Sequence, residues 1–220
     1  MVCKFPNKLK YNSCLAEIIG IMLGDGCLYL DYRNKYHTIV CFHKYETDYM
    51  GYVKYLFESY FKDYKFSISE QKSEFLLRNV SVFVGEQLIY AGLKTGNKIK
   101  NRVSSPIWIF KNNLFLIRFL RGIFDTDGCI YRKYGKYLQI QFKFASIFIL
   151  NSVRKALLNL GYHPTVIQKS LNNERFYEWK IYLSRQQEIH NFFLQVKPKN
   201  NKHLLRYMVM VKMGTLGLSE

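Results

Sequence analysis

Two short stretches of the sequence end alike and could place two carboxylates in one site. IIGIMLGDG spans residues 18–26, and LRGIFDTDG spans residues 120–128. Each is an apolar run with glycine at its third position and Asp-Gly at its end, so Asp25 and Asp127 occupy matching positions. Carboxylates are hard oxygen ligands of the kind that bind Mg²⁺ or Ca²⁺. A single Asp-Gly pair is typical of a simple turn, but two matched copies favour a shared cation site.

The elements that must position these carboxylates are expected to be two helices. Asn12 or Ser13 can cap the first helix, and Asn112 or Asn113 can cap the second. Each helix is expected to stop at its Asp-Gly pair, because glycine is common just past a helix end. An aspartate there faces the negative end of the helix dipole, at a cost of roughly 0.3–1 kcal/mol that a bound cation would offset.

Small residues recur with helical spacing inside both runs. Gly20 and Gly24 stand four positions apart, and so do Gly122 and Thr126. Residues at i and i+4 share one face of a helix, so each helix offers a stripe that another backbone can approach closely. We therefore expect the two helices to pack on each other and to bring the two aspartates together.

The rest of the chain repeats a similar order of elements after each run. Strand-like runs are YHTIVCFHK, KFSIS, EFLLRNVSVF, GKYLQIQFKF, TVIQKS and FYEWKIYLS, and of these GKYLQIQFKF alternates strictly between apolar and polar residues. Helical patterns fall near residues 48–61, 84–92, 147–160 and 186–194. Pro106 and nearby asparagines break regular structure. We expect a duplicated α+β fold with a first half at 1–103, a linker at 104–113 and a second half at 114–220.

Charge is the strongest signal in the composition. The 220 residues include 33 Lys and Arg against 16 Asp and Glu, a formal net charge of +17. Such a surface indicates a polyanionic partner, nucleic acid before an anionic membrane, although a merely basic or ribosome-associated protein is an alternative. No apolar run approaches the roughly 20 residues that cross a bilayer, and the start lacks the apolar core of a signal peptide. We expect an intracellular protein, in the cytoplasm or an organelle, with no membrane as a partner.

The two runs resemble the paired motif of the LAGLIDADG homing endonucleases, in the monomeric form that carries two copies. LRGIFDTDG keeps that motif's third glycine, its sixth and eighth aspartates and its ninth glycine. IIGIMLGDG keeps the third glycine and the final Asp-Gly but has Leu23 at the sixth position, which is not the usual metal ligand. The resemblance implies two pseudo-symmetric α-β-β-α-β-β-α halves with curved antiparallel sheets, packed through two central motif helices.

The resemblance also implies an intron-encoded enzyme that acts as a monomer on double-stranded DNA. It would hydrolyse one phosphodiester in each strand of a long, asymmetric target and leave short 3′ overhangs. Asp25 and Asp127 would hold the catalytic metal, assisted by the backbone carbonyls of Gly24 and Thr126. The expected ion is Mg²⁺, which would bridge the scissile phosphates and activate water. Ca²⁺ or Mn²⁺ could substitute for binding or for activity.

Other members of the family place basic or polar residues around this centre. Lys197 resembles the family's catalytic lysine, and Lys98 or Lys100 is its expected first-half equivalent. His43 and Lys44 stand where a Gln-Lys pair often occurs. The alternative for any one of these lysines is a solvated or phosphate-facing charge, and for His43 a polar strand residue.

The resemblance places one strand-rich surface of each half in the DNA major groove, which admits a two-stranded ribbon. In GKYLQIQFKF the polar residues alternate with apolar ones, so they share a face. An ordinary solvated sheet face is the alternative. The expected DNA-binding residues are Tyr29, Asp31, Arg33, His37, Ile39 and Cys41 in the first half, and Arg132, Lys136, Tyr137, Gln139, Gln141 and Lys143 in the second.

Two other functions fit the same fold. One is an RNA maturase that assists the splicing of its own intron, and the other is a DNA-binding regulator that does not cleave. The two intact aspartates favour an active nuclease over a degenerate regulator. An embedded intein nuclease is less well supported, because the chain ends LGLSE without a His-Asn terminus. The cysteines form no CxxC pair and show no ligand spacing with the histidines, so a zinc-dependent nuclease lacks support.

Overall fold

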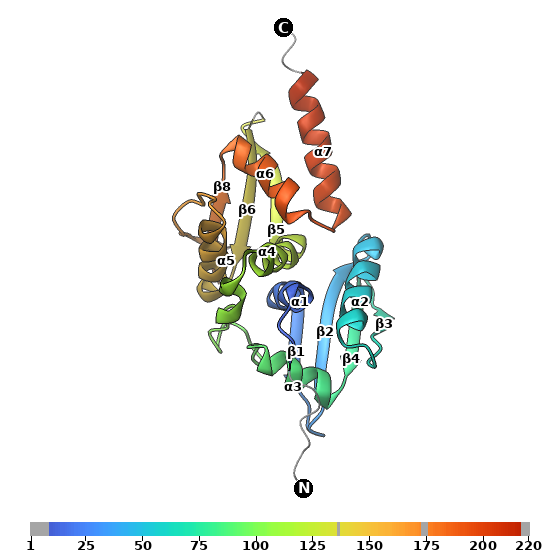
Figure 1. The fold of residues 1–220 in the computed structure, drawn as a ribbon. Helices are drawn as coiled ribbons and strands as arrows, with labels where there is room; N and C mark the ends of the chain where they lie inside the picture. Colours follow the sequence, from blue (N-terminus) through green and yellow to red (C-terminus); the bar gives the residue numbers. More distant parts are fainter. Residues whose placement is uncertain (1–8, 136, 173–175, 217–220) are drawn as a thin grey trace.

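The chain folds as two halves that repeat one order of elements (Figure 1). The computed structural model describes residues 9–135, 137–172 and 176–216. The first half contains α1 (Ser13–Leu23), β1 (Gly26–Leu30), β2 (Tyr36–His43), α2 (Thr47–Tyr60), β3 (Ser67–Glu70), β4 (Glu74–Val80) and α3 (Val82–Tyr90). After the short helix η1 (Ile107–Lys111) come α4 (Asn113–Asp127), β5 (Gly128–Lys133), β6 (Tyr137–Phe144), α5 (Ile147–Asn159), β7 (Gln168–Asn172), β8 (Phe176–Leu183), α6 (Gln186–Val196) and α7 (Asn201–Leu216).

Each half holds one four-stranded antiparallel sheet. The strand orders are β1-β2-β4-β3 and β5-β6-β8-β7, so the two sheets have the same topology. Figure 1 shows the sheets on opposite sides of the central helices α1 and α4. This is the predicted α+β architecture, with an α-β-β-α-β-β-α order in each half and α7 added after the second. Within the described residues, no helix is long and apolar enough to cross a membrane.

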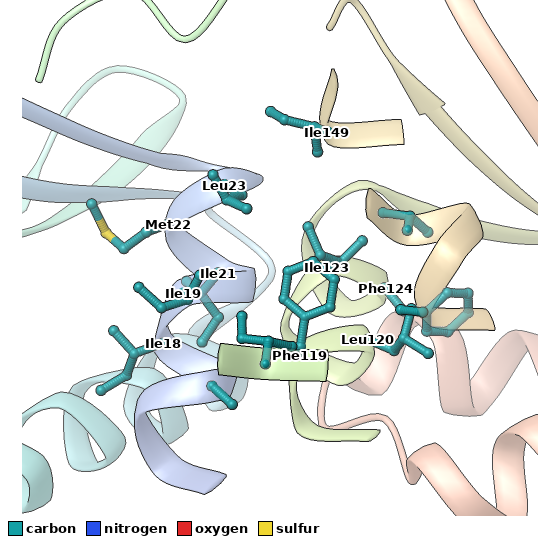
Figure 2. Packing of buried hydrophobic residues seen from close by; sticks show 14 of the residues in the cluster. Ile18, Ile19, Ile21, Met22, Leu23, Phe119, Leu120, Ile123, Phe124 and Ile149 are labelled. Atoms are coloured by element: carbon teal, nitrogen blue, oxygen red, sulfur yellow. The ribbon is translucent and has the colours of Figure 1, made fainter. Parts of the chain in front are cut away.

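The helices α1 and α4 pack backbone against backbone at their glycines. A methyl group added at Gly20 would lie 2.4 Å from the carbonyl oxygen of Phe119, and one at Gly122 would lie 2.4 Å from that of Glu17. Real Cβ atoms essentially never come so close, so only glycine fits at either position. The predicted contact between small-residue stripes is therefore confirmed, and Figure 2 shows the apolar side chains that flank it.

The two motif helices begin as the sequence predicts but end differently. The side chain of Asn12 accepts a hydrogen bond from the Leu15 amide, and that of Asn112 accepts one from the Leu114 amide. The second helix continues to Asp127, whereas the first stops at Leu23 and leaves Asp25 in the turn that enters β1. Gly24 caps α1 with φ −78° and ψ −106°, well outside helical values. The matching residue of the second run, Thr126, stays within α4.

A buried charge cluster also joins the two halves. Glu17 on α1 is fully buried, and its carboxylate lies 2.9 Å from Arg118 Nε and 3.5 Å from an Arg121 guanidinium nitrogen on α4. Tyr52 on α2 donates a hydrogen bond of 2.5 Å to the same carboxylate. Burial raises the pKa of Glu17, and the two arginines oppose that rise. The cluster fixes α1 and α4 in one relative position, because a carboxylate left alone there would be costly.

Candidate metal centre and nucleic-acid interface

The structure brings the ends of the two motif runs together. A methyl group added at Gly24 would lie 2.1 Å from Thr126 Oγ1 and 2.5 Å from Asp127 Oδ2, so the first turn sits directly against the second aspartate. Asp25 follows Gly24 in that turn, and its charge acts on Asp127. The two predicted metal ligands therefore share one place, at the carboxyl ends of α1 and α4.

The electrostatics of this pair favour a cation. Burial first, and repulsion from Asp25 second, raise the pKa of Asp127 to about 7, although Lys98 and Lys202 oppose the rise. Burial also raises the pKa of Asp25, although the residue keeps an exposed surface. Two carboxylates that resist ionisation next to each other are stabilised by a divalent ion between them.

Of the two lysines expected near this centre in the first half, Lys98 reaches it, from the loop after α3. Its ammonium donates hydrogen bonds to the carbonyl oxygens of Leu23, at 3.0 Å, and of Gly24. The charges of Asp25 and Asp127 act on it, while burial lowers the pKa of Lys98. The lysine therefore caps the end of α1 and balances part of the charge of the two aspartates.

In the segment after α6, Lys202 is the lysine whose charge acts on the two aspartates. Lys197 is exposed at the carboxyl end of α6, in a left-handed conformation with φ 52°. Lys202 lies in the first turn of α7, and its charge acts on both Asp25 and Asp127. Its ammonium pairs with Glu46 at 2.7 Å. A catalytic role for Lys197 remains a prediction without a supporting contact.

A polar network missed by the sequence reasoning holds Lys202 in place. Asn200 donates to Glu46 Oε1 at 2.7 Å and to the Asp125 carbonyl at 2.9 Å. The Asp125 carboxylate accepts hydrogen bonds from the amides of Lys199, at 2.8 Å, and of Asn200, at 3.1 Å. Asp125 is the sixth-position acid of the motif, and burial raises its pKa to about 7. This acid anchors the chain between α6 and α7, while Leu23 takes the same position in the first half.

His43 and Lys44 have partners outside the carboxylate pair. His43 is exposed at the end of β2, and its amide donates to Glu46 Oε2 at 2.9 Å. Lys44 pairs with Glu70 of β3 at 3.0 Å. His43 thus contacts the network that holds Lys202, whereas Lys44 pairs with the neighbouring strand. The predicted catalytic roles of both residues rest on the resemblance alone.

The residues present fit a hard divalent cation. Gly24 lets the first turn come close to Thr126 and Asp127, and the nearby donors are carboxylate and carbonyl oxygens, which suit Mg²⁺, Mn²⁺ or Ca²⁺. Among the described residues, no group of three or more His, Cys, Asp or Glu side chains could hold a metal ion. Asp25 and Asp127 therefore need further oxygen ligands, from the backbone, water or a phosphate.

The outer face of the first sheet collects most of the predicted DNA-binding residues of that half. Cys27 is opposite Ile39, and Tyr29 is opposite His37, so these side chains and Cys41 share a face. His37 stacks on Tyr29 with ring centroids 4.5 Å apart and bonds to Asp31 at 2.9 Å. Asp31 also accepts from the Arg33 amide in the turn between β1 and β2. The sequence missed the contributions of β3 and β4 to this face, namely Ser67, Ser69, Glu74, Leu76, Arg78 and Val80.

The outer face of the second sheet carries a bonded polar network. Tyr131 donates to Gln139 at 2.6 Å, and Gln139 donates to Ser184 at 2.7 Å. Gln141 donates to the Tyr182 hydroxyl at 3.1 Å. Pairing registers place Tyr137 and Lys143 on the same face, together with the unpredicted Lys133, Gln168, Lys180 and Tyr182. The alternation expected in this strand is confirmed.

Arg132, which was also expected to bind DNA, does not lie on this face. Side chains alternate along β5, so Tyr131 and Lys133 face outwards while Arg132 points to the helical side. Its guanidinium donates to the carbonyl oxygens of Gly135 and of Met210 in α7. Arg132 therefore holds the last helix against the sheet. Lys136, the other basic residue expected here, lies outside the described residues.

Comparisons with known proteins agree with this architecture. A family model described as a LAGLIDADG-like domain matches residues 115–197. A structure of mesophilic variants of the homing endonuclease I-DmoI is similar with a TM-score of 0.62 and 18% identity, over 84% of this chain and 94% of that one. I-DmoI in complex with DNA and Mn gives a TM-score of 0.59 at 18% identity, over 84% and 96%.

The protein DUF199/WhiA also has a similar fold. Full-length DUF199/WhiA from Thermatoga maritima gives a TM-score of 0.57 at 15% identity, over 91% of this chain and 60% of that one. The comparison with curated proteins gave no significant match. Residues 115–197 thus match a LAGLIDADG-like domain, and the chain has the two-halved fold of I-DmoI that its paired runs predict.

Proposed function

We propose that this chain is a metal-dependent endonuclease that cuts both strands of duplex DNA at one long, asymmetric site. The observation that carries the proposal is the meeting of Asp25 and Asp127 at the ends of two helices that come from separate halves. Each aspartate is costly where it stands, and a shared cation removes that cost. A bound divalent ion supplies Lewis-acid stabilisation and a water activated near neutral pH.

Different residues of the chain would bind the ion, stabilise negative charge and position the lysines. Asp25, Asp127 and the carbonyls of Gly24 and Thr126 would hold the ion. Lys98 and Lys202 would place positive charge beside a scissile phosphate, where negative charge grows in the transition state. We infer that the network of Asp125, Asn200 and Glu46 positions Lys202 for this task, because it holds the chain directly before Lys202 and pairs with the Lys202 ammonium.

DNA recognition would use the outer faces of both sheets. These faces present glutamine, tyrosine, lysine and arginine side chains, which pair with base edges and phosphates. The two faces differ in sequence, so a monomer of this chain would read an asymmetric target. The net charge of +17 would make binding depend steeply on salt.

Selection from a randomised duplex library tests the proposal. The wild-type chain with Mg²⁺ should cut library members that share one long asymmetric sequence, and a chelator should abolish cutting. Tight binding to one sequence without cutting, in Mg²⁺ or Mn²⁺, would instead support a DNA-binding regulator on the same fold. The DNA-binding regulator is the second candidate function, because a fold alone does not decide an activity.

A further inference from the structure

The ammonium of Lys98 is hydrogen-bonded to a backbone carbonyl oxygen that the proposed metal would use as a ligand. Its Nζ donates to the carbonyl of Gly24, and at 3.0 Å to the carbonyl of Leu23. These carbonyls belong to the end of α1, where the last turn of a helix leaves its carbonyls without partners. Orphan carbonyls beside carboxylates attract any cation, and in the structure the cation that they bind is the lysine.

The position of Lys98 fits a counter-ion rather than a surface charge. Its side chain is half-buried, and the charges of Asp127 and Asp25 both act on it. Among the described residues, neither aspartate lies within ion-pair distance of the lysine, so its hydrogen bonds go to the backbone instead. Lys202, the other lysine near the aspartates, is held 2.7 Å from Glu46. Lys98 is therefore the ammonium that caps the first motif helix.

We propose that the Lys98 ammonium and a divalent cation compete for the Gly24 carbonyl, so that the ion binds only after displacing the lysine. The inference rests on the proposed function, because it takes Gly24 as a ligand of the metal. Magnesium binds oxygen at about 2.0–2.1 Å and calcium at about 2.3–2.6 Å. An ammonium donating to the same oxygen would stand within a few ångströms of a doubly charged ion, and the two repel strongly at that separation.

After its displacement, the Lys98 ammonium has a second role as a phosphate-binding group. The released ammonium remains tethered beside the aspartate pair and can turn to a phosphate. Lys98 then weakens binding of the metal to the protein alone, while it strengthens binding of the DNA phosphate once the ion is in place. These opposite effects separate a displaced counter-ion from a lysine that only helps catalysis.

Manganese binding by the chelator-treated, full-length chain tests the competition, with free Mn²⁺ measured by electron paramagnetic resonance. Lys98→Met keeps the length of the side chain and removes its charge, and it should bind Mn²⁺ about tenfold more tightly, equivalent to about 1.4 kcal/mol. Lys94→Met is the matched control. Lys94 is an exposed lysine in the same loop that donates to the Asn101 carbonyl at 3.0 Å, and its loss should leave the affinity unchanged.

An unaltered or weaker affinity in Lys98→Met would overturn the competition. A wild-type chain that binds no Mn²⁺ would overturn the proposed metal centre itself, so the two failures are distinct. Reductive methylation of the wild-type chain, read residue by residue by mass spectrometry, covers the case in which Lys98→Met does not fold. Saturating Ca²⁺ should increase methylation of Lys98 and leave Lys94 unchanged, and equal labelling of Lys98 with and without Ca²⁺ would contradict displacement.

Discussion

Replacement of Gly20 by alanine tests the helix contact on which the whole site depends. An added Cβ would lie 2.4 Å from the Phe119 carbonyl oxygen, 3.0 Å from the Ile123 amide nitrogen and 3.1 Å from the Gly122 Cα. All three atoms belong to the backbone of α4, which cannot turn aside as a side chain can. Ordinary contact begins at 3.4 Å, so the two helices must separate by about 1 Å at this point.

The cost of that separation can be compared with a position that has room. Overpacking a core typically costs about 1–3 kcal/mol, whereas alanine in place of glycine gains up to about 1 kcal/mol in an unhindered helix. Gly51 in α2 is exposed, and a Cβ added there meets nothing within 4 Å. Gly51→Ala should therefore stabilise the protein, while Gly20→Ala should destabilise it.

Urea denaturation followed by circular dichroism measures both variants. We expect the free energies of unfolding of the two variants to differ by about 2 kcal/mol or more, with wild type between them. Gly20→Ala should also lose cleavage, because a shift of α1 against α4 moves Asp25 relative to Asp127. Equal stability of Gly20→Ala and Gly51→Ala would refute the close backbone contact.

Three further predictions follow from buried and exposed charges. Glu17→Ala leaves two arginines without their carboxylate and should cost about 3–5 kcal/mol of unfolding free energy. Its control, Lys54→Met, breaks a surface pair with Glu58 and should cost under about 1 kcal/mol. Similar losses in the two variants would contradict the buried cluster. Burial lowers the pKa of His203 to about 3, so the unfolded chain takes up a proton below pH 6.5 that the folded chain refuses. This histidine alone contributes a fall in stability from pH 6.5 towards pH 3, by at most about 1.4 kcal/mol for each pH unit, whereas Asp125 and Asp127, whose pKa values are raised to about 7, contribute in the opposite direction as the pH falls. The stability of wild type relative to His203→Phe, measured in thermal melts, should therefore decrease as the pH is lowered, and a difference that does not change with pH would contradict a buried neutral histidine. Lys133→Ala and Lys180→Ala, on the outer face of the second sheet, should each reduce the slope of log affinity against log salt by about 1, a change that Lys62→Ala, on an exposed lysine after α2, should not produce.

The sequence predicted the centre of this protein better than its surroundings. Two matched runs with small residues at i and i+4 were enough to predict that α1 and α4 pack together and that Asp25 meets Asp127. Strict alternation in β6 was enough to predict that Gln139 and Gln141 share a face, because side-chain period decides the face of a strand. These are local patterns, and local patterns can be read directly.

The errors concern contacts between distant parts of the chain. Lys202 pairs with Glu46, and Asn200 bonds to the same glutamate across 154 positions, so only the folded arrangement reveals this network. The sixth-position Asp125 was the one available signal, since a buried acid needs partners. Arg132 was expected to bind DNA, but strand alternation places it on the face opposite to Tyr131 and Lys133. Tyr131 and Tyr182 were missed because they join this face only through the pairing of β5 and β8 with β6, which the sequence does not give.

The central claim is that one carboxylate from each half holds the metal that cuts DNA. Its most direct test compares single-turnover cleavage of the selected target by Asp25→Asn and Asp127→Asn with that by Asp63→Asn, which changes an exposed aspartate after α2. Binding to the same duplex in Ca²⁺ is measured in parallel. We predict that both motif variants still bind the duplex but cut neither strand, while Asp63→Asn cuts as wild type does. Wild-type cleavage by either motif variant would contradict the account.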